Sequence, residues 1–372
     1  MPDIAGVTAP GFEPVADAFA ANFAEGLELG ASFAAIIDDE VVVDLHGGFA
    51  DRAEQKPWTA DTIVPVYSTT KPIAALVAAW CVSRGLLDYE GPVADVWPDF
   101  GAHGKESVTL AQMLSHQAGV PGFPDPIDPA LWLDPPALAE ACASLAPMWR
   151  PGAQSGYHPL TWGYLIGAVV ARAAGRTLGT ILREEICAPL GIDFHIGTPA
   201  REHARCAEIK RPTTLPQLGD INAYKRAAFL TKWSSPDRGG AIWREIEIPS
   251  ANGHGGALAV ARLYSAYAQG GAIDGLEICD ARTFDALTRR RYAGEDLVLP
   301  GPVDWAAGVM RNTPGVYGPN PSGFGHSGWG GSMGLADPDR RLSASYVMNR
   351  QTHSLQGDPR AQRLIAALYG CL

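Results

Sequence analysis

The chain has 372 residues, of which 47% are hydrophobic and 19% are charged, and its formal net charge is −11. This length and composition predict a globular protein with a large core and two subdomains. The acidic balance argues against a nucleic-acid partner, whose phosphates would repel it. No stretch approaches a membrane span, and the N-terminal residues lack the basic start and apolar core of a secretory signal. We therefore expect a cytoplasmic protein without membrane contact.

Hydrophobic patterns predict elements of both kinds along the chain. In chain order they are a helix at 10–23, strands at 31–37 and 40–48, helices at 72–85 and 160–172, strand-like segments at 305–309, 332–336 and 342–349, and a last helix at 359–369. We expect the early and late strands to join one antiparallel sheet, in an α+β fold flanked by helices.

The same patterns suggest how the subdomains divide the chain. Residues 1–71 together with about 201–372 are predicted to form a mixed α/β subdomain, and residues of about 72–200 a mainly helical one, with the active site at their junction. The weakly periodic stretch 210–249, which contains Trp233 and Trp243, fits either a cover that lines an acyl pocket or plain connecting structure.

The cysteines and histidines give no metal signature. The six cysteines are widely scattered, which favours reduced, mostly buried thiols over disulfides or zinc ligands. They are Cys81, Cys142, Cys187, Cys206, Cys279 and Cys371. The nine histidines form no His-x-x-x-His or His-Glu-x-x-His motif, so neither a metal site nor a cofactor is predicted.

Ser68 and Lys71 are the most informative pair in the sequence. Their spacing at the start of the 72–85 helix puts a hydroxyl and an amine on one helix face. A lysine carried into this largely apolar helix would be desolvated, which favours the neutral amine that can take the hydroxyl proton. Ser-x-x-Lys also arises by chance, as an N-cap followed by a solvated lysine, so further signals are needed.

Two other segments carry suitable chemistry. Tyr157 stands in a Pro/Gly turn before the 160–172 helix, and a loop can aim a phenol where a helix face cannot. Far downstream lies Phe324-Gly325-His326-Ser327-Gly328-Trp329-Gly330-Gly331, close to the 342–349 strand. Its glycines let backbone approach a ligand, and a strand edge offers N–H donors to a developing oxyanion.

In this order, the three segments resemble the Ser-x-x-Lys, Tyr-x-Asn or Ser-x-Asn, and Lys-Thr-Gly motifs of the serine β-lactamase and penicillin-binding-protein family. The likeness is strongest to the class C β-lactamase-like esterases, the family VIII carboxylesterases. The segments 112–121 and 249–264 also look like family sequences, so the resemblance covers nearly the whole chain. It implies a β-lactamase-like fold and a serine hydrolase.

The resemblance also implies residue roles. Ser68 would be the nucleophile, Lys71 and Tyr157 would remove and return its proton, and the backbone N–H groups of Ser68 and Trp329 would form the oxyanion hole. The ring of Trp329 would also wall the acyl pocket. Substrate would be bound by the third-motif residues His326, Ser327, Gly328 and Trp329.

Two departures from the family pattern bear on the substrate. Pro159 stands where β-lactamases carry an asparagine that holds the acylamino group, and His326 replaces a lysine that would meet a carboxylate. Both changes favour small neutral carboxylic esters, cleaved through a Ser68 acyl-enzyme without a cofactor. The alternatives on the same fold are a β-lactamase, a D-amino-acid peptidase or amidase, an acyltransferase, and a penicillin-binding sensor that is acylated without turnover.

A rival nucleophile is Ser332, since Gly330-Gly331-Ser332-Met333-Gly334 matches the Gly-x-Ser-x-Gly motif of α/β-hydrolases. That motif needs a strand-to-helix turn, whereas this one lies between two expected strands, so Ser68 is preferred.

The remaining histidines have weaker claims to a role in catalysis. We expect His116 to stabilise its loop or the core. His158 could orient Tyr157 or be solvated, and His254 could satisfy backbone groups or face the cleft. His326 is expected to polarise Tyr157 or to bond substrate.

Overall fold

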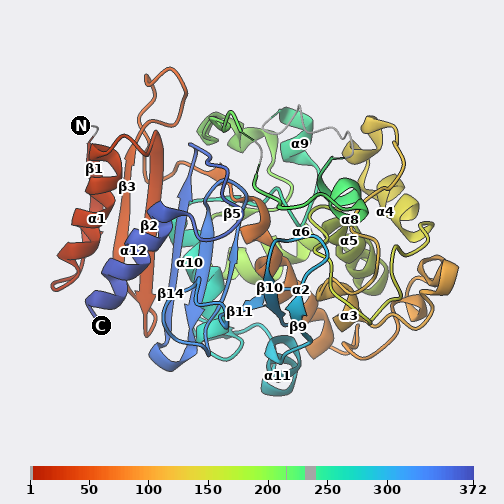
Figure 1. The fold of residues 1–372 in the computed structure, drawn as a ribbon. Coiled ribbons are helices and arrows are strands. Elements are labelled where there is room, and N and C mark those ends of the chain that lie inside the picture. Colours follow the sequence, from red (N-terminus) through yellow and green to blue (C-terminus); the bar gives the residue numbers. More distant parts are fainter. Residues whose placement is uncertain (1–2, 215, 231–239) are drawn as a thin grey trace.

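A computed structural model describes residues 3–214, 216–230 and 240–372. Within these ranges the main sheet is nine-stranded and antiparallel, with the order β1-β3-β2-β14-β13-β12-β11-β10-β9. Its first three strands come from the N-terminal end of the chain and the others from the C-terminal end, so that β2 pairs with β14 (Figure 1). The predicted α+β fold, with early and late strands in one antiparallel sheet, is confirmed.

The strands of the main sheet are β1 Ile4–Thr8, β2 Gly30–Ile37, β3 Glu40–Gly48, β9 Tyr292–Glu295, β10 Pro302–Trp305, β11 Met310–Arg311, β12 Phe324–Ser327, β13 Met333–Asp337 and β14 Leu342–Met348. A small sheet joins β4 Val64–Pro65, β6 His254–Gly255 and β5 Phe194–His195, and a hairpin joins β7 Ala272–Ile273 to β8 Leu276–Glu277.

The α-helices are α1 Glu13–Ala24, α2 Thr70–Ser83, α3 Leu110–Leu114, α4 Pro135–Ala143, α5 Thr161–Ala174, α6 Leu178–Ile181, α7 Ala188–Leu190, α8 Ala223–Lys225, α9 Ala241–Glu245, α10 Ala257–Ala268, α11 Ala281–Thr288 and α12 Pro359–Gly370. The four predicted helices correspond to α1, α2, α5 and α12, with starts close to the expected positions.

Helices cover both faces of the sheet. On one face α1 and α12 lie against each other, and Phe33 and Tyr346 belong to the hydrophobic cluster that they share with the strands. On the other face α10 packs on β2, β13 and β14, in a cluster that includes Ala34 and Val347. Neighbouring residues of a strand point to opposite faces, so every residue of β14 is buried.

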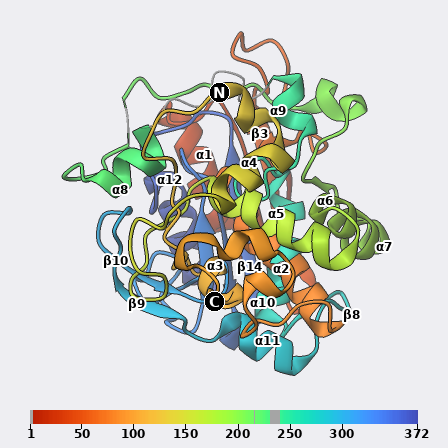
Figure 2. The same ribbon diagram turned by 90° about the vertical axis from the view of Figure 1, so that its right-hand side faces the viewer.

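The helices α3, α4 and α5 lie to one side of the sheet, at the right of Figure 1 and toward the viewer in Figure 2. The subdomain boundaries near residues 71 and 200 stay a prediction. Among the described residues, no single helix is long and apolar enough to cross a membrane. The bent pair Thr161–Ala174 and Leu178–Leu190 passes that test only when its helices are taken together.

The helix α2 carries the first predicted motif into the core. Its residues from Thr70 to Cys81 are all buried, and its alanines let neighbouring elements approach closely. Pro72 stands in the first turn, where a missing N–H costs no helical hydrogen bond. The helix ends at Ser83, and Gly85, at φ +70°, takes the left-handed conformation common just after a helix.

The strand predicted at 305–309 is wrong in part. Only Trp305 belongs to a strand there, and the residues 306–309 form the turn that joins β10 to β11. Gly308 has φ +92°, and a Cβ atom there would lie 2.7 Å from Ala75 Cβ on α2. The apolar residues that suggested a strand are buried because this turn packs on a helix.

We expect Gly308→Ala to destabilise the fold more than Gly301→Ala, its matched control. Both glycines have positive φ, but a Cβ at Gly301 meets no atom within 4 Å. The two variants share the cost of a positive φ, and Gly308→Ala adds overpacking, worth about 1–3 kcal/mol. Urea unfolding measures the difference, and equal midpoints would contradict the packing described for this turn.

Candidate active site

A cavity of about 170 Å³ opens at the start of α2, where Ser68 forms part of its wall. Most of the lining is apolar, and among the described lining residues none is Lys, Arg, Asp or Glu. The apolar part includes Leu160, Leu218, Phe229, Trp243, Leu299 and Leu355. The cavity therefore suits an uncharged ligand.

The chain turns sharply to present Ser68 to this cavity. After β4 it enters a 3₁₀ turn, Tyr67–Thr69, that runs directly into α2. Tyr67 has φ +49°, a left-handed conformation that costs a non-glycine residue about 1–2 kcal/mol. Its carbonyl accepts the Thr70 hydroxyl, and Thr70 Oγ1 in turn accepts the N–H of Gly253. These bonds hold the backbone conformation at the serine.

Lys71 lies directly behind Ser68 and is fully buried. Its Nζ is 3.0 Å from Ser68 Oγ, 2.9 Å from the carbonyl oxygen of Pro159 and 3.1 Å from that of Ser250. Nζ also lies 4.7 Å from the ring centroid of Tyr157. Burial holds the pKa of Lys71 well below its usual value, which favours the neutral amine.

Tyr157 approaches Ser68 from the loop before α5. Its hydroxyl donates to Ser68 Oγ at 2.7 Å, and burial raises the pKa of the phenol, which keeps this proton in place. The ring stacks on Trp305 at a centroid distance of 5.9 Å and an angle of 7°. Asp296 accepts the backbone N–H of Tyr157 at 2.9 Å and the hydroxyl of Ser155 at 2.8 Å. The loop is thereby fixed against β10 and the segment after β9.

The donors and acceptors around Ser68 are compatible with either protonation state of Lys71. As an ammonium, Lys71 donates to Ser68 Oγ and to the carbonyls of Pro159 and Ser250. A neutral amine has two N–H groups and one lone pair, and those carbonyls can only accept. In the neutral state they can take both N–H groups, so the lone pair is left to accept the proton of Ser68.

The third predicted segment turns beside Ser68. His326 and Ser327 end β12, and the turn at Gly328–Gly331 leads to β13. The Gly328 N–H donates to the Ser332 carbonyl at 2.7 Å, and Trp329 lines the cavity with its ring 5.9 Å from that of Tyr67. This turn brings the two predicted oxyanion residues, Ser68 and Trp329, to the same cavity.

Ser332 faces away from the cavity. It is 1% exposed, its Oγ donates to the Val66 carbonyl at 2.7 Å, and it also lies 3.2 Å from Thr69 Oγ1. It stands in the turn between two antiparallel strands rather than at a strand-to-helix turn. Ser332 therefore lacks the setting of a nucleophile and instead ties the Trp329 turn to the segment around Ser68.

His326 lines the cavity as a neutral ring. Its Nδ1 lies 2.8 Å from the carbonyl oxygen of Ser327, and no described residue forms a hydrogen bond with its buried Nε2. Burial, with the nearby Lys71, lowers the pKa of His326 to about 3. Its ring centroid is 6.0 Å from that of Tyr157, with no hydrogen bond between the two side chains. His326 thus supplies no cation where the family motif has lysine.

The other three candidate histidines, His116, His158 and His254, have internal partners. His116 accepts the backbone N–H of His158, which in turn bonds to Gly156 and Val120 through its two ring nitrogens. Burial lowers the pKa of His158 to about 3. His254 bonds to the carbonyl of Asn252 and packs on Trp243. These contacts are structural, and none of the three histidines contacts Ser68.

Part of the stretch at 210–249 contributes to the site. Leu218, Phe229 and Trp243 line the cavity, so the pocket-lining alternative holds for these residues. Trp233 lies outside the described residues.

Sequence reasoning missed several supporting groups. The Ser250 carbonyl and the Asp296 carboxylate hold Lys71 and Tyr157, and Tyr67 provides the left-handed turn. Backbone carbonyls and a non-glycine positive φ leave no sequence pattern. Asp296 has one weak signal, as an acidic residue two positions before the buried pair Val298 and Leu299, whose N–H groups it accepts. In the described parts of the chain, no cluster of His, Cys, Asp or Glu could hold a metal ion.

Comparison with known proteins identifies the family of the chain. The model of the family described as Beta-lactamase matches residues 19–367. The chain is 36% identical to the esterase/beta-lactamase LipL of Mycobacterium tuberculosis over 93% of this chain and 82% of LipL. It also resembles two solved structures over the full length of each: a penicillin-binding protein homologue from Caulobacter crescentus, with 53% identity and a TM-score of 0.96, and a family VIII carboxylesterase, with 41% identity and a TM-score of 0.93. The chain belongs to the beta-lactamase family of serine hydrolases.

Proposed function

We propose that the protein is a carboxylesterase that cleaves small neutral esters through an acyl-enzyme on Ser68. The observation that carries this proposal is the pairing of the Ser68, Lys71 and Tyr157 cluster with a cavity whose described lining has no charged side chain. The cluster fits acyl transfer, and the lining fits an uncharged substrate. Names of relatives that include esterase and carboxylesterase support the same activity.

The proposed reaction begins with proton transfer from Ser68 to neutral Lys71. Ser68 Oγ attacks the ester carbonyl, and the oxyanion is held by the N–H groups of Ser68 and Trp329. Tyr157 donates its hydroxyl proton to the departing alkoxide and recovers one from the Lys71 ammonium. Water then attacks the acyl-enzyme with the proton transfers reversed, which releases the acid and restores Ser68.

The cavity also disfavours anionic substrates such as penicillins. A substrate carboxylate that enters this cavity would lose its hydrating water and would meet no cation among the described lining residues, because His326 is neutral at ordinary pH. Pro159 likewise has no side-chain amide for an acylamino group. A neutral ester with an apolar acyl chain instead contacts Leu160, Phe229 and Trp243 without this cost. The β-lactamase alternative is therefore weaker and is tested directly below.

A reducing location is part of the proposal. All six cysteines are free, and five of them are buried, as expected for thiols that are never oxidised to disulfides. We propose a cytoplasmic enzyme, and cell fractionation with an antibody against the chain tests this location.

We expect Ser68→Ala to abolish ester hydrolysis and leave the fold intact. Ser68 is the hydroxyl that contacts both Lys71 and Tyr157. Mass spectrometry of the wild-type protein treated with an organophosphonate should place the adduct on Ser68. Ser332→Ala should still be labelled on Ser68. An adduct on Ser332 in the wild-type protein would rule out the proposed mechanism.

We expect Lys71→Ala and Tyr157→Phe each to lower kcat/KM by roughly 10²–10⁴-fold, the span for a positioned proton-transfer group. The losses should not add in the double variant, because the two groups serve one proton path. Steady-state kinetics at neutral pH measure both effects. Near-wild-type turnover in either single variant would disprove the role assigned to that residue.

The pH profile separates Lys71 from His326. Activity needs neutral Lys71, so kcat/KM should fall as the pH drops through the lowered pKa of Lys71 and should stay high above it. His326, with a pKa of about 3, is neutral from mildly acidic pH upward, so an acid limb at mildly acidic pH or above does not come from this ring. The acid limb should therefore keep its position in His326→Asn. Loss of that limb in His326→Asn would reassign it to the histidine.

We expect kcat/KM for short p-nitrophenyl esters to exceed that for nitrocefin or penicillin by at least about tenfold. A β-lactam loses an amide hydrogen bond at Pro159 and a charge-assisted one at His326, worth about 0.5–1.5 and 1.5–3 kcal/mol, and about 1.4 kcal/mol corresponds to tenfold. Pro159→Asn with His326→Lys should narrow the gap. Equal efficiency on penicillin and the best ester would favour the β-lactamase alternative.

A further inference from the structure

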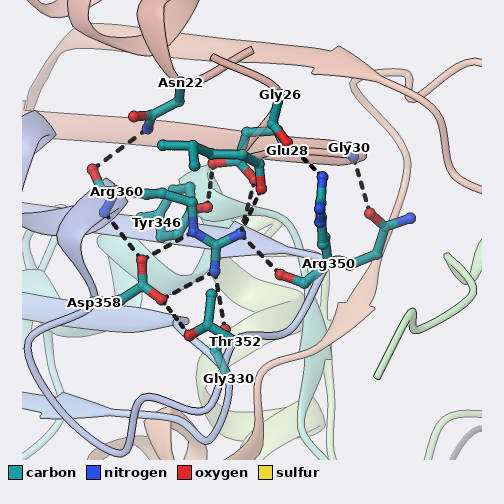
Figure 3. Close-up of polar contacts among 12 residues, drawn as sticks. Asn22, Gly26, Glu28, Gly30, Gly330, Tyr346, Arg350, Thr352, Asp358 and Arg360 are labelled. Carbon is teal, nitrogen blue, oxygen red and sulfur yellow. Dashed lines mark hydrogen bonds and ion pairs between the residues drawn. The ribbon is translucent and has the colours of Figure 1, made fainter. Parts of the chain in front are cut away.

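A buried charged network lies behind the turn that carries Trp329. Arg360, in the first turn of α12, is 2% exposed and contacts two buried carboxylates, Asp358 and Glu28 (Figure 3). Its Nε and Nη2 donate to the two oxygens of Asp358 at 2.9 and 3.0 Å, and its Nη1 donates to Glu28 Oε2 at 3.1 Å. The second oxygen of Glu28 accepts the hydroxyl of Tyr346. The guanidinium is thus held on two sides.

The same guanidinium bonds to the turn itself. Arg360 Nη2 donates to the carbonyl oxygen of Gly330 at 3.0 Å, as Figure 3 shows. At Gly331, which has φ +129°, a Cβ atom would lie 2.5 Å from Arg360 Nη2 and 2.8 Å from Asp358 Oδ2. Glycine at this position lets the backbone rest directly on the charged pair. The network and the turn are therefore in contact, with no side chain between them.

Further bonds fix the peptides on both sides of Gly330. Gln351 Nε2 donates to the Trp329 carbonyl at 2.9 Å, and the Thr352 N–H donates to the Gly330 carbonyl at 3.0 Å. The Thr352 hydroxyl donates to Asp358 Oδ2 at 2.7 Å, which joins the segment of Gln351 and Thr352 to the charged network. The carbonyls of Trp329 and Gly330 are thereby held from one side, while the turn faces the cavity on the other.

An arginine suits this task because its donors are fixed in one plane. Two carboxylates set the orientation of that plane, and the orientation in turn sets where the Gly330 carbonyl can lie. Although burial raises the pKa of Asp358, the hydrogen bonds from Arg360 outweigh it, so this carboxylate stays charged. Burial of charges is a costly route to stability alone, since well-packed apolar side chains serve equally well. A fixed position of the Gly330 carbonyl explains the network better than stability does.

We propose that Arg360, oriented by Asp358 and Glu28, is a positioning residue that holds the Gly330 carbonyl, thereby fixes the turn that carries the Trp329 N–H relative to Ser68, and so shapes the oxyanion hole. This inference rests on the proposed function, because it needs an acyl-enzyme on Ser68. Arg360 touches no substrate and acts through the Gly330 carbonyl. Its effect belongs to the transition state, where the oxyanion forms, rather than to binding of the ester.

The test compares Arg360→Lys and Asp358→Asn with Arg363→Met. Lysine keeps the charge but presents one nitrogen in place of a planar fork. Asparagine keeps the N-cap of α12 and leaves Arg360 paired with Glu28. Arg363 is the matched control, since it stands on the same helix but contacts Asn22 and Glu25 instead of the turn. If Arg360→Lys fails to fold, Asp358→Asn carries the test.

Three measurements distinguish a role in positioning the turn from a role only in holding α12 in place: the kinetic constants kcat and KM, the inhibition constant of a boronic acid, and the thermal midpoint. For a p-nitrophenyl ester, the two test variants should lower kcat by about tenfold or more with little change in KM, since loss of a whole oxyanion donor costs about 10²–10³-fold. Their inhibition constants for a boronic acid, which forms a tetrahedral adduct on Ser68, should rise by a similar factor. Arg363→Met should keep wild-type values of kcat and of that inhibition constant, even if its thermal midpoint falls.

A lower thermal midpoint in Arg360→Lys and Asp358→Asn with unchanged kcat and boronic-acid affinity would overturn the proposal, because the network would then only anchor the helix. A rise in KM at constant kcat would overturn it as well. Phosphonate labelling keeps this failure distinct from failure of the proposed function. If wild-type Ser68 is labelled and the variants keep full kcat, only the role of Arg360 is lost, whereas an unlabelled wild-type Ser68 removes the esterase mechanism itself.

Discussion

The chemistry of this site depends on a lysine buried without a carboxylate. The described hydrogen bonds of Lys71 reach only neutral oxygens, those of Ser68, Pro159 and Ser250, and burial alone accounts for its lowered pKa. A carboxylate within about 4–6 Å would favour the ammonium and remove the base. In the proposed mechanism, burial among the apolar walls of α2 and its neighbours is therefore what makes Lys71 a base, and the two backbone carbonyls hold its Nζ beside Ser68.

Holding that arrangement requires segments far apart in the chain. The hydroxyls of Tyr264 and Tyr267 on α10 donate to the carbonyls of Thr69 and Pro72, so a helix on one face of the sheet fixes the start of α2. Ser332 joins the same region to the Trp329 turn through the Val66 carbonyl. Ser332, which the sequence offered as a rival nucleophile, and the core tyrosines Tyr264 and Tyr267 therefore connect the segments that carry the candidate site residues.

The sequence was sufficient for the elements that rest on local pattern. The strand patterns predicted that early and late strands such as β2 and β14 share one sheet, and the apolar run of α2 predicted a helix that desolvates its lysine. The family resemblance implied that Ser68, Lys71 and Tyr157 act together. The strand pattern failed at 306–309, where apolar residues pack a turn on α2 instead of forming a strand. Contacts made by backbone carbonyls, and carboxylates such as Asp296 that cap distant loops, depend on tertiary approach and have no local signature.

Pro159 shows how one position can separate two roles. The backbone carbonyl oxygen of Pro159 lies 2.9 Å from Lys71 Nζ, and the proline ring fixes the φ angle of this residue. An asparagine would add a side-chain amide able to bind an acylamino group, which proline cannot. In the proposed esterase, proline would thus keep the carbonyl contact to Lys71 and lack an amide that could bind the acylamino group of a β-lactam. In the proposed esterase, Pro159 and a neutral His326 would leave a cavity that selects its substrate by shape and apolar contact instead of by charge.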